Sequence, residues 1–138
     1  MKLMSLRIIT KDIKQSVMFY EKAMGLTAQW YTEDFAELAT HSITIAIGST
    51  RTMKMFGGEH LAESKGQIST IIEFLVDDVD AEYKKIKNLT DHIVQEPTTM
   101  PWGNRSLLFC DPDGNLINFF APVSPEAIQK FNKVETQK

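Results

Sequence analysis

The predicted secondary-structure elements of this chain occur twice in the same order. In the first half, a strand at 2–9 precedes a helix and three short strands at 27–31, 35–38 and 42–47. In the second half, a strand at 68–76 precedes a helix and three strands at 92–95, 104–110 and 116–120. The two halves therefore resemble two copies of one β-α-β-β-β module, which strongly limits the possible folds.

Capping residues align the two helices. Asp12 is followed three residues later by Gln15, which predicts a helix start, and Gly25 is a natural stop. Asp77 or Asp78 begins the second helix in the same way. An offset of 66 positions, which matches Asp12 with Asp78, also matches the apolar helix faces, because Val17 falls on Tyr83 and Tyr20 on Ile86.

The expected fold is of the α+β class. The 138 residues suit one domain with a first module at about 1–50, a linker at about 51–67 and a second module at about 68–122. A third helix is expected at about 124–135, since Ser124-Pro125-Glu126 is a strong helix start. Side by side, the modules would form a cupped eight-stranded mixed sheet with the helices outside.

Composition excludes several classes of protein. The formal net charge of -3 gives no basic footprint for a nucleic acid partner. A single cysteine, Cys110, rules out an intrachain disulfide and fits a reducing compartment. The first ten residues contain no long apolar run, so neither a signal peptide nor a membrane span is expected there. We therefore expect a cytoplasmic protein that needs no membrane.

Strand alternation directs several polar side chains into the predicted cup. Ser5 and Arg7 share one face of the first strand, Glu73 lies on the equivalent strand of the second module, and Asn118 interrupts the apolar last strand. Arg7 and Glu73 form an ion pair in one interpretation, whereas in the other Arg7 grips an anionic or carbonyl group of a ligand. Asn118 is either a satisfied inner amide or a group that faces a cavity.

Two tryptophans are expected near the rim of the cup. Trp30 lies beside Tyr31 on a predicted strand, and Trp102 lies in the Pro-Trp-Gly loop that enters the last hairpin. Such rings either close a core or stack against a planar ligand. The hairpin itself is marked by Asp111-Pro112-Asp113-Gly114, a tight-turn sequence between two apolar runs.

Several blocks of the sequence resemble the vicinal oxygen chelate superfamily, also called the glyoxalase/bleomycin resistance/dioxygenase superfamily. They span nearly the whole chain and are DIKQSVMFY (12–20) with Gly25-Leu26, FLVDDV (74–79), PWG (101–103) and FCDPDGN (109–115). The resemblance implies paired β-α-β-β-β modules with a cupped sheet. It also implies a small-molecule ligand and a homodimer.

Metal-dependent members of this superfamily carry His or Glu at four inward strand positions. By local spacing these positions fall on Ser5, on or beside Ile45 and Ala46, on Ile71 and on Asn118, none of which is a histidine or carboxylate. The three histidines, His41, His60 and His92, are scattered and match none of them. No metal and no other cofactor is therefore expected, which disfavours lactoylglutathione lyase and ring-cleaving dioxygenase chemistry.

The sequence then favours a metal-independent small-molecule-binding protein, similar to the drug-sequestering members of the superfamily. The candidate ligand-binding residues in the cup are Ser5, Arg7, Trp30, Glu73, Trp102 and Asn118. The alternative is a glyoxalase-like lyase, isomerase or dioxygenase with an atypical or absent metal site. In a metal-free enzyme, Glu73 would be the general base and Arg7 would stabilise an enolate. A purely structural role, with the cup filled by side chains, is the third hypothesis.

Overall fold

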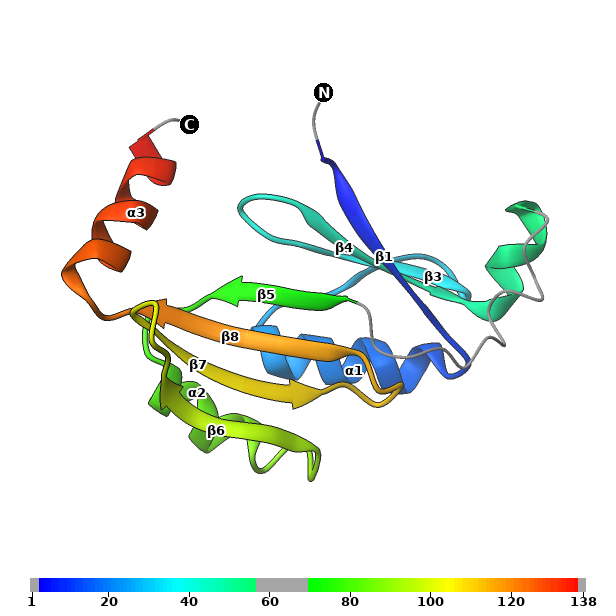
Figure 1. Cartoon of the computed structure of the whole chain (residues 1–138). Helices are drawn as coiled ribbons and strands as arrows, with labels where there is room; N and C mark the ends of the chain where they lie inside the picture. The colour runs from blue at the N-terminus through cyan, green and yellow to red at the C-terminus, as the bar shows by residue number, and fades with distance from the viewer. Residues whose placement is uncertain (1–2, 57–69, 137–138) are drawn as a thin grey trace. The chain divides into compact units, whose positions relative to one another are not determined.

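Each half of the chain folds into a β-α-β-β-β module, as a computed structural model of residues 3–56 and 70–136 shows, with side chains described for 3–53 and 70–132 (Figure 1). Unit 1 (Met1–Gln67) contains β1 (Ser5–Thr10), α1 (Ile13–Met24), β2 (Gln29–Thr32), β3 (Phe35–Ala39), β4 (Thr44–Ser49) and the 3-10 helix η1 (Thr50–Phe56). Unit 2 (Ile68–Lys138) contains β5 (Ile71–Leu75), α2 (Val79–Ile86), β6 (Ile93–Thr99), β7 (Asn104–Cys110), β8 (Leu116–Pro122) and α3 (Pro125–Thr136).

The strands form two mixed four-stranded sheets with the same topology. The order is β1-β4-β3-β2 in unit 1 (sheet A) and β5-β8-β7-β6 in unit 2 (sheet B). In each sheet the first strand pairs parallel with the last, and the other pairs are antiparallel. The predicted α+β class and the repeated module are confirmed. Assembly of the two units into a single domain with one cupped sheet stays a prediction.

The helix starts lie where the capping residues predict them. The Asp12 carboxylate accepts a hydrogen bond from the Gln15 backbone N–H at 3.1 Å, and Asp78 accepts one from Ala81 at 3.1 Å. Such a cap contributes about 1 kcal/mol to stability, because it satisfies an N–H group that the helix leaves unpaired. Gly25 ends α1 at φ 66°, a left-handed conformation that glycine adopts without steric cost.

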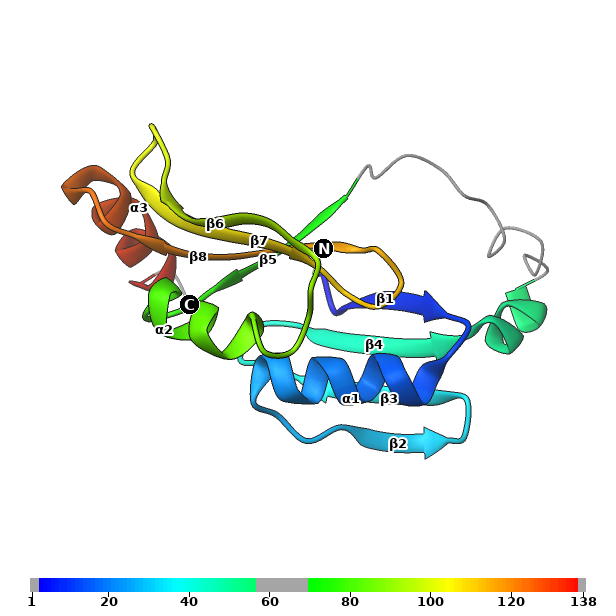
Figure 2. The same cartoon turned by 90° about the horizontal axis from the view of Figure 1, so that it is seen from below.

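One face of each sheet forms a core with its helix. In unit 1, α1 lies across β3 and β4 (Figure 2). The core side chains there include Val17, Tyr20, Leu38, Ile45 and Ile47. In unit 2, α2 contacts β6, β7 and β8. Its core includes Ile86, Leu107, Phe109, Ile117 and Phe119. We call the face turned away from α1 or α2 the open face of each sheet.

The hairpin between β7 and β8 closes as its sequence predicts. Asp111 Oδ1 accepts hydrogen bonds from the backbone N–H groups of Asp113 and Asn115, at 2.9 and 2.8 Å. The other carboxylate oxygen accepts from Asn115 Nδ2 at 2.8 Å, and Gly114 adopts φ 89°. Because Asp111 is buried, these bonds hold the turn together without help from solvent.

The third helix packs on the open face of sheet B, on the opposite side from α2 (Figures 1 and 2). The Phe131 ring centroid lies 5.2 Å from that of Phe120, which alternates along β8 with the core residues Ile117 and Phe119. The helix starts at Pro125, and Ser124 Oγ accepts from the Ala127 N–H at 3.1 Å. The predicted third helix is confirmed, and its Phe131 ring covers part of the open face at one end.

The predicted linker is partly helical. Its beginning belongs to η1, and residues 57–67 lie outside the described residues. The start of η1 is tied to the turn between β2 and β3, since Asp34 Oδ1 accepts from Ser49 Oγ at 2.8 Å and from Arg51 Nε at 2.9 Å. Across the described ranges, the structure contains no helix of the length and apolar character that crossing a bilayer requires.

Candidate functional site

The open face of sheet A carries the first two predicted site residues. Ser5 and Arg7 lie on this face of β1 and are exposed. Across the sheet, Arg7 is in register with Ala46 of β4, which is in register with Glu37 of β3. The next row on the same face is Ile9, Gly48 and Phe35. The strand β4 thus places only small residues between the side chains of β1 and β3.

Arg7 reaches across β4 to an aromatic side chain. Its guanidinium carbon lies 4.7 Å from the centre of the Phe35 ring, within cation–π distance. The Tyr31 ring centroid lies 6.0 Å from that of Phe35. Hydrogen bonding to Glu37, followed by desolvation and the charge of Glu37, raises the pKa of Tyr31. The face thus combines a guanidinium, two aromatic rings and a carboxylate.

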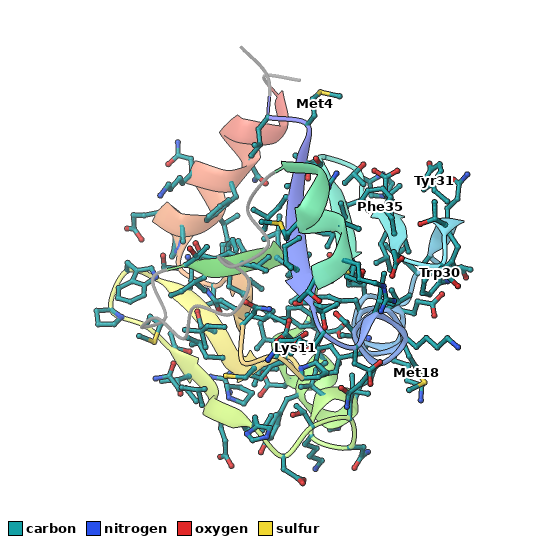
Figure 3. All side chains as sticks on the ribbon, turned by 90° about the vertical axis from the view of Figure 1, so that its right-hand side faces the viewer. Met4, Lys11, Met18, Trp30, Tyr31 and Phe35 are labelled. Atoms are coloured by element: carbon teal, nitrogen blue, oxygen red, sulfur yellow. The ribbon has the colours of Figure 1, made fainter. Side chains whose placement is uncertain are left out.

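Trp30 does not share this face. It is in register with Ala36, which is fully buried on the α1 side of β3. Figure 3 shows Trp30 toward α1, with Tyr31 on the other side of β2. The Trp30 side chain is 43% exposed. Sequence reasoning noted both Trp30 and Tyr31 but chose Trp30 as the site residue. It missed Phe35 and Glu37, although alternation with the apolar Ala36 and Leu38 places them on the opposite face.

The open face of sheet B brings two predicted site residues together. Glu73 on β5 is in register with Asn118 on β8, and both point away from α2. The Asn118 side-chain amide donates a hydrogen bond from Nδ2 to Glu73 Oε2 at 2.8 Å. Ile71 and Leu75 flank Glu73 on the same face, opposite Leu116 and Phe120 of β8. A carboxylate and an amide are thus held together among apolar side chains.

Asn118 is only half satisfied by this bond. Its side chain is 9% exposed, and in the described part of the chain its buried Oδ1 atom has no hydrogen-bond partner. A buried acceptor without a donor costs about 1–3 kcal/mol. The sequence offered a satisfied inner amide or a group facing a cavity, and the observed amide has one satisfied end and one unsatisfied end.

Trp102 lies in the turn between β6 and β7, and its side chain is 64% exposed. The next residue, Gly103, accepts hydrogen bonds on its carbonyl from the N–H groups of Val123 and Ser124, which lead into α3. The two tryptophans therefore occupy different kinds of position, a turn and a strand.

Arg7 belongs to unit 1 and Glu73 to unit 2, so an ion pair between them stays a prediction.

The positions to which the resemblance assigns metal ligands do not fit a divalent metal. Ser5, Ala46, Ile71 and Asn118 lie on the open faces, whereas Ile45 is buried toward α1. A hydroxyl, alkyl groups and one amide lack the imidazole and carboxylate donors that such a site needs. Within either unit, the described residues form no group of three or more His, Cys, Asp or Glu side chains that could hold a metal ion.

Cys110 lies on the open face of sheet B, since it is in register with Leu116 of that face. Partial burial raises the pKa of its thiol, and the negative charge of Asp111 adds to this effect. Both causes disfavour the thiolate, which is the nucleophilic form of cysteine. Cys110 is therefore a poor nucleophile at neutral pH.

Known proteins share the sequence pattern and the fold. The sequence model of the Glyoxalase/Bleomycin resistance protein/Dioxygenase superfamily matches residues 2–119. The uncharacterized protein YraH of Bacillus subtilis (strain 168) is 30% identical over 125 residues, which cover 87% of this chain and 98% of YraH. The uncharacterized protein YwbC of the same organism is 30% identical over 118 residues, or 82% of this chain and 91% of YwbC.

A solved structure extends this likeness to the fold. The crystal structure of a glyoxalase/bleomycin resistance protein/dioxygenase family enzyme from Burkholderia phytofirmans PsJN matches with a TM-score of 0.81 at 17% identity. The match covers 89% of this chain and 100% of that one. At this identity the likeness concerns the fold alone, whereas the sequence match over residues 2–119 concerns the family. The chain belongs to the glyoxalase/bleomycin resistance/dioxygenase (vicinal oxygen chelate) superfamily.

Proposed function

We propose that this protein binds a small organic molecule on its open sheet faces without a resident metal ion. The observation that carries the proposal is the bond between Asn118 and Glu73, at a position to which the resemblance assigns a metal ligand. At that position the Asn118 amide is hydrogen-bonded to the Glu73 carboxylate. The other positions that the resemblance assigns to metal ligands carry no imidazole or carboxylate. The polar groups of these faces are therefore suited to hydrogen bonding rather than to metal coordination.

The chemistry of the open face in unit 1 supports an organic ligand. Phe35 and Tyr31 offer aromatic surface to a planar group, and the Arg7 guanidinium beside them suits a carboxylate or carbonyl oxygen. Ser5 and the exposed Trp102 are further candidate contacts. We assign no contact to Trp30, because it lies on the α1 side of sheet A.

Metal analysis combined with a thermal-shift screen tests the proposal. The protein would be produced in metal-replete medium, analysed for bound metal by mass spectrometry, and screened with divalent ions and small organic compounds. We expect much less than one metal ion per chain, no change in Tm on chelation, and a raised Tm with some organic compounds. Stoichiometric zinc, nickel or iron whose removal lowers Tm would contradict the proposal.

Ligand contact is checked by tryptophan fluorescence. A compound that raises Tm is expected to quench part of the emission in the wild type and in Trp30→Phe, but not in Trp102→Ala. The alternative function, a lyase, isomerase or dioxygenase with an atypical or absent metal site, predicts turnover of the bound compound. Turnover that is lost in Glu73→Gln would favour that alternative, with Glu73 as the general base.

We also propose a homodimer in the cytoplasm. The dimer is inferred from the family, and the compartment from the single cysteine. Light scattering during size-exclusion chromatography measures the mass in solution. A mass near that of a single 15.7 kDa chain at micromolar concentration would contradict the dimer.

A further inference from the structure

A carboxylate stands between two exposed aliphatic side chains on β5. Ile71 is 46% exposed and Leu75 is 49% exposed, and both lie on the open face of sheet B with Glu73 between them. Phe120, in register with Leu75, packs against Phe131 of α3 and extends the apolar surface at this end. The strand thus presents a single negative charge within an apolar strip.

Asn118 holds this carboxylate at a cost. Its Nδ2 group must face Glu73 Oε2, because turning the amide over would bring its oxygen against the carboxylate oxygen. Oδ1 is then directed away from Glu73 and remains buried without a partner in the described part of the chain. Departures from local satisfaction of this kind are expected at functional sites, where geometry matters more than stability.

The chemistry of Glu73 indicates what it would bind. An ionised carboxylate only accepts hydrogen bonds, and one bond from Asn118 leaves acceptor sites on both oxygens. Because Glu73 is exposed, these sites can be reached from solvent. A charged N–H donor forms a hydrogen bond to a carboxylate that is about twice as strong as one from a neutral donor. The apolar neighbours lower the local dielectric constant, which strengthens such a bond further.

We propose that Glu73 binds the ammonium group of an amine that carries an apolar substituent. Ile71 and Leu75 contact the substituent, and Asn118 is a positioning residue that fixes the carboxylate. This inference rests on the proposed function, since it names the ligand chemistry of one of the open faces. It concerns unit 2 alone and needs no residue of unit 1.

Three matched compounds test the inference. Benzylamine, benzyl alcohol and benzoate share an aromatic ring and carry a positive, a neutral and a negative polar group. Titration of the full chain by NMR is expected to show binding of benzylamine, with shifted amide signals in β5 and β8, and at least tenfold weaker binding of the other two. Equal binding of benzylamine and benzyl alcohol would overturn the inference.

Variants assign the effect to the two residues. Glu73→Gln keeps the shape and removes the charge, so benzylamine should bind at least tenfold more weakly. Glu96→Gln is the matched control, because Glu96 is an exposed carboxylate of unit 2 that accepts a hydrogen bond from Tyr83 on α2. Unchanged affinity in Glu73→Gln, or equal losses in both variants, would overturn the assignment.

Asn118→Leu separates positioning from a structural role. The leucine removes the unsatisfied oxygen and frees Glu73, so Tm should stay the same or rise while benzylamine affinity falls. A lower Tm with unchanged affinity would show that Asn118 is only structural. If benzoate binds and benzylamine does not, the ligand class is wrong although the binding function stands. Stoichiometric metal, measured separately, would overturn the binding function itself.

Discussion

The Arg7 guanidinium carbon lies 4.7 Å from the centre of the Phe35 ring, although the strand β4 separates the strands that carry these two residues. The contact is possible because the β4 residues in register with Arg7 and Phe35 are Ala46 and Gly48, which have small or no side chains. A Cβ atom on Gly48 would lie 3.7 Å from Phe35 Cδ2 and 2.9 Å from Thr52 Oγ1. Small residues in the middle strand therefore let side chains of the outer strands meet.

The same strand pairing carries different chemistry in the second module. There Glu73 takes the place of Arg7 in the parallel pair, and its partner is Asn118 rather than Ala46. The β8 residue has a polar side chain that bonds to β5 directly, whereas the β4 residue has only a methyl group. The repeat thus keeps the scaffold and varies the open faces, one with a guanidinium on an aromatic ring and one with a carboxylate held by an amide.

Gly103 is expected to be far more sensitive to substitution than Gly114. Both have positive φ angles, 94° and 89°. A Cβ atom on Gly103 would lie 2.0 Å from Ser124 Oγ, which caps α3, whereas a Cβ atom on Gly114 meets nothing within 4 Å. Gly103→Ala should cost about 2–4 kcal/mol of unfolding free energy and Gly114→Ala about 1–2 kcal/mol. Urea unfolding measures both, and equal costs would contradict the contact with Ser124.

Much of this fold is readable from local sequence. Caps at Asp12 and Asp78, the turn at Asp111 and the start of α3 each depend on hydrogen bonds between residues a few positions apart. All were predicted, with Asp78 as one of two candidates for its cap. The site was only partly predicted. Alternation put Arg7, Glu73 and Asn118 on the sheet faces turned away from the helices, as observed, and their convergence on one cup stays a prediction. The place of Trp30 depends on the β2–β3 register. That register contains a bulge near Trp30, which a short polar strand does not reveal.

The packing of α3 illustrates the same limit. In the sequence, Ile128, Phe131 and Val134 recur at helical spacing, and such an apolar stripe shows that a helix docks without showing where it docks. Its contact with the open face depends on Phe131 meeting Phe120, residues that belong to different elements. Contacts between elements of this kind are decided by tertiary packing.

Two leucines of unit 2 distinguish its two sheet faces. Leu107 is fully buried on the α2 side, and Leu75 is 49% exposed on the open face. Truncation of a buried leucine removes apolar burial and leaves a cavity, so Leu107→Ala should cost about 2–5 kcal/mol, against less than about 1 kcal/mol for Leu75→Ala. Thermal and urea unfolding of both variants check this difference. A large cost at Leu75 would mean that this side chain is buried in solution.

The ion pair between Arg105 and Asp80 should make the stability of unit 2 depend on pH. Arg105 Nε and Nη2 donate to the two carboxylate oxygens at 2.8 and 2.9 Å, which joins β7 to α2. These hydrogen bonds hold the pKa of Asp80 below its usual range. A lowered pKa in the folded state stabilises the protein above the unfolded value of about 4, and the effect disappears as the pH falls through the folded value.

The variant Asp80→Asn is therefore expected to have a lower Tm than the wild type at pH 7. The difference should shrink as the pH falls from about 4 through the lowered folded pKa of Asp80, because the carboxylate is protonated first in the unfolded state and then in the folded state. Asp77→Asn is the control, since Asp77 is an exposed carboxylate shortly before α2. A difference in Tm that is the same at pH 7 and at pH 3 would show that the ion pair does not cause it.

Tyr31 provides a test of the open face in unit 1. Hydrogen bonding to Glu37 raises the pKa of Tyr31 above its usual value near 10. This interaction therefore stabilises the folded state below that pH, and its contribution is lost as the pH rises through the folded pKa. In Glu37→Gln the tyrosine should ionise at lower pH, as followed by NMR of ring-labelled tyrosine. Tyr83, whose hydroxyl donates to Glu96 at 3.0 Å, is the internal reference, and its titration should not change. An unchanged Tyr31 titration in Glu37→Gln would mean that Tyr31 and Glu37 are not bonded on this face in solution.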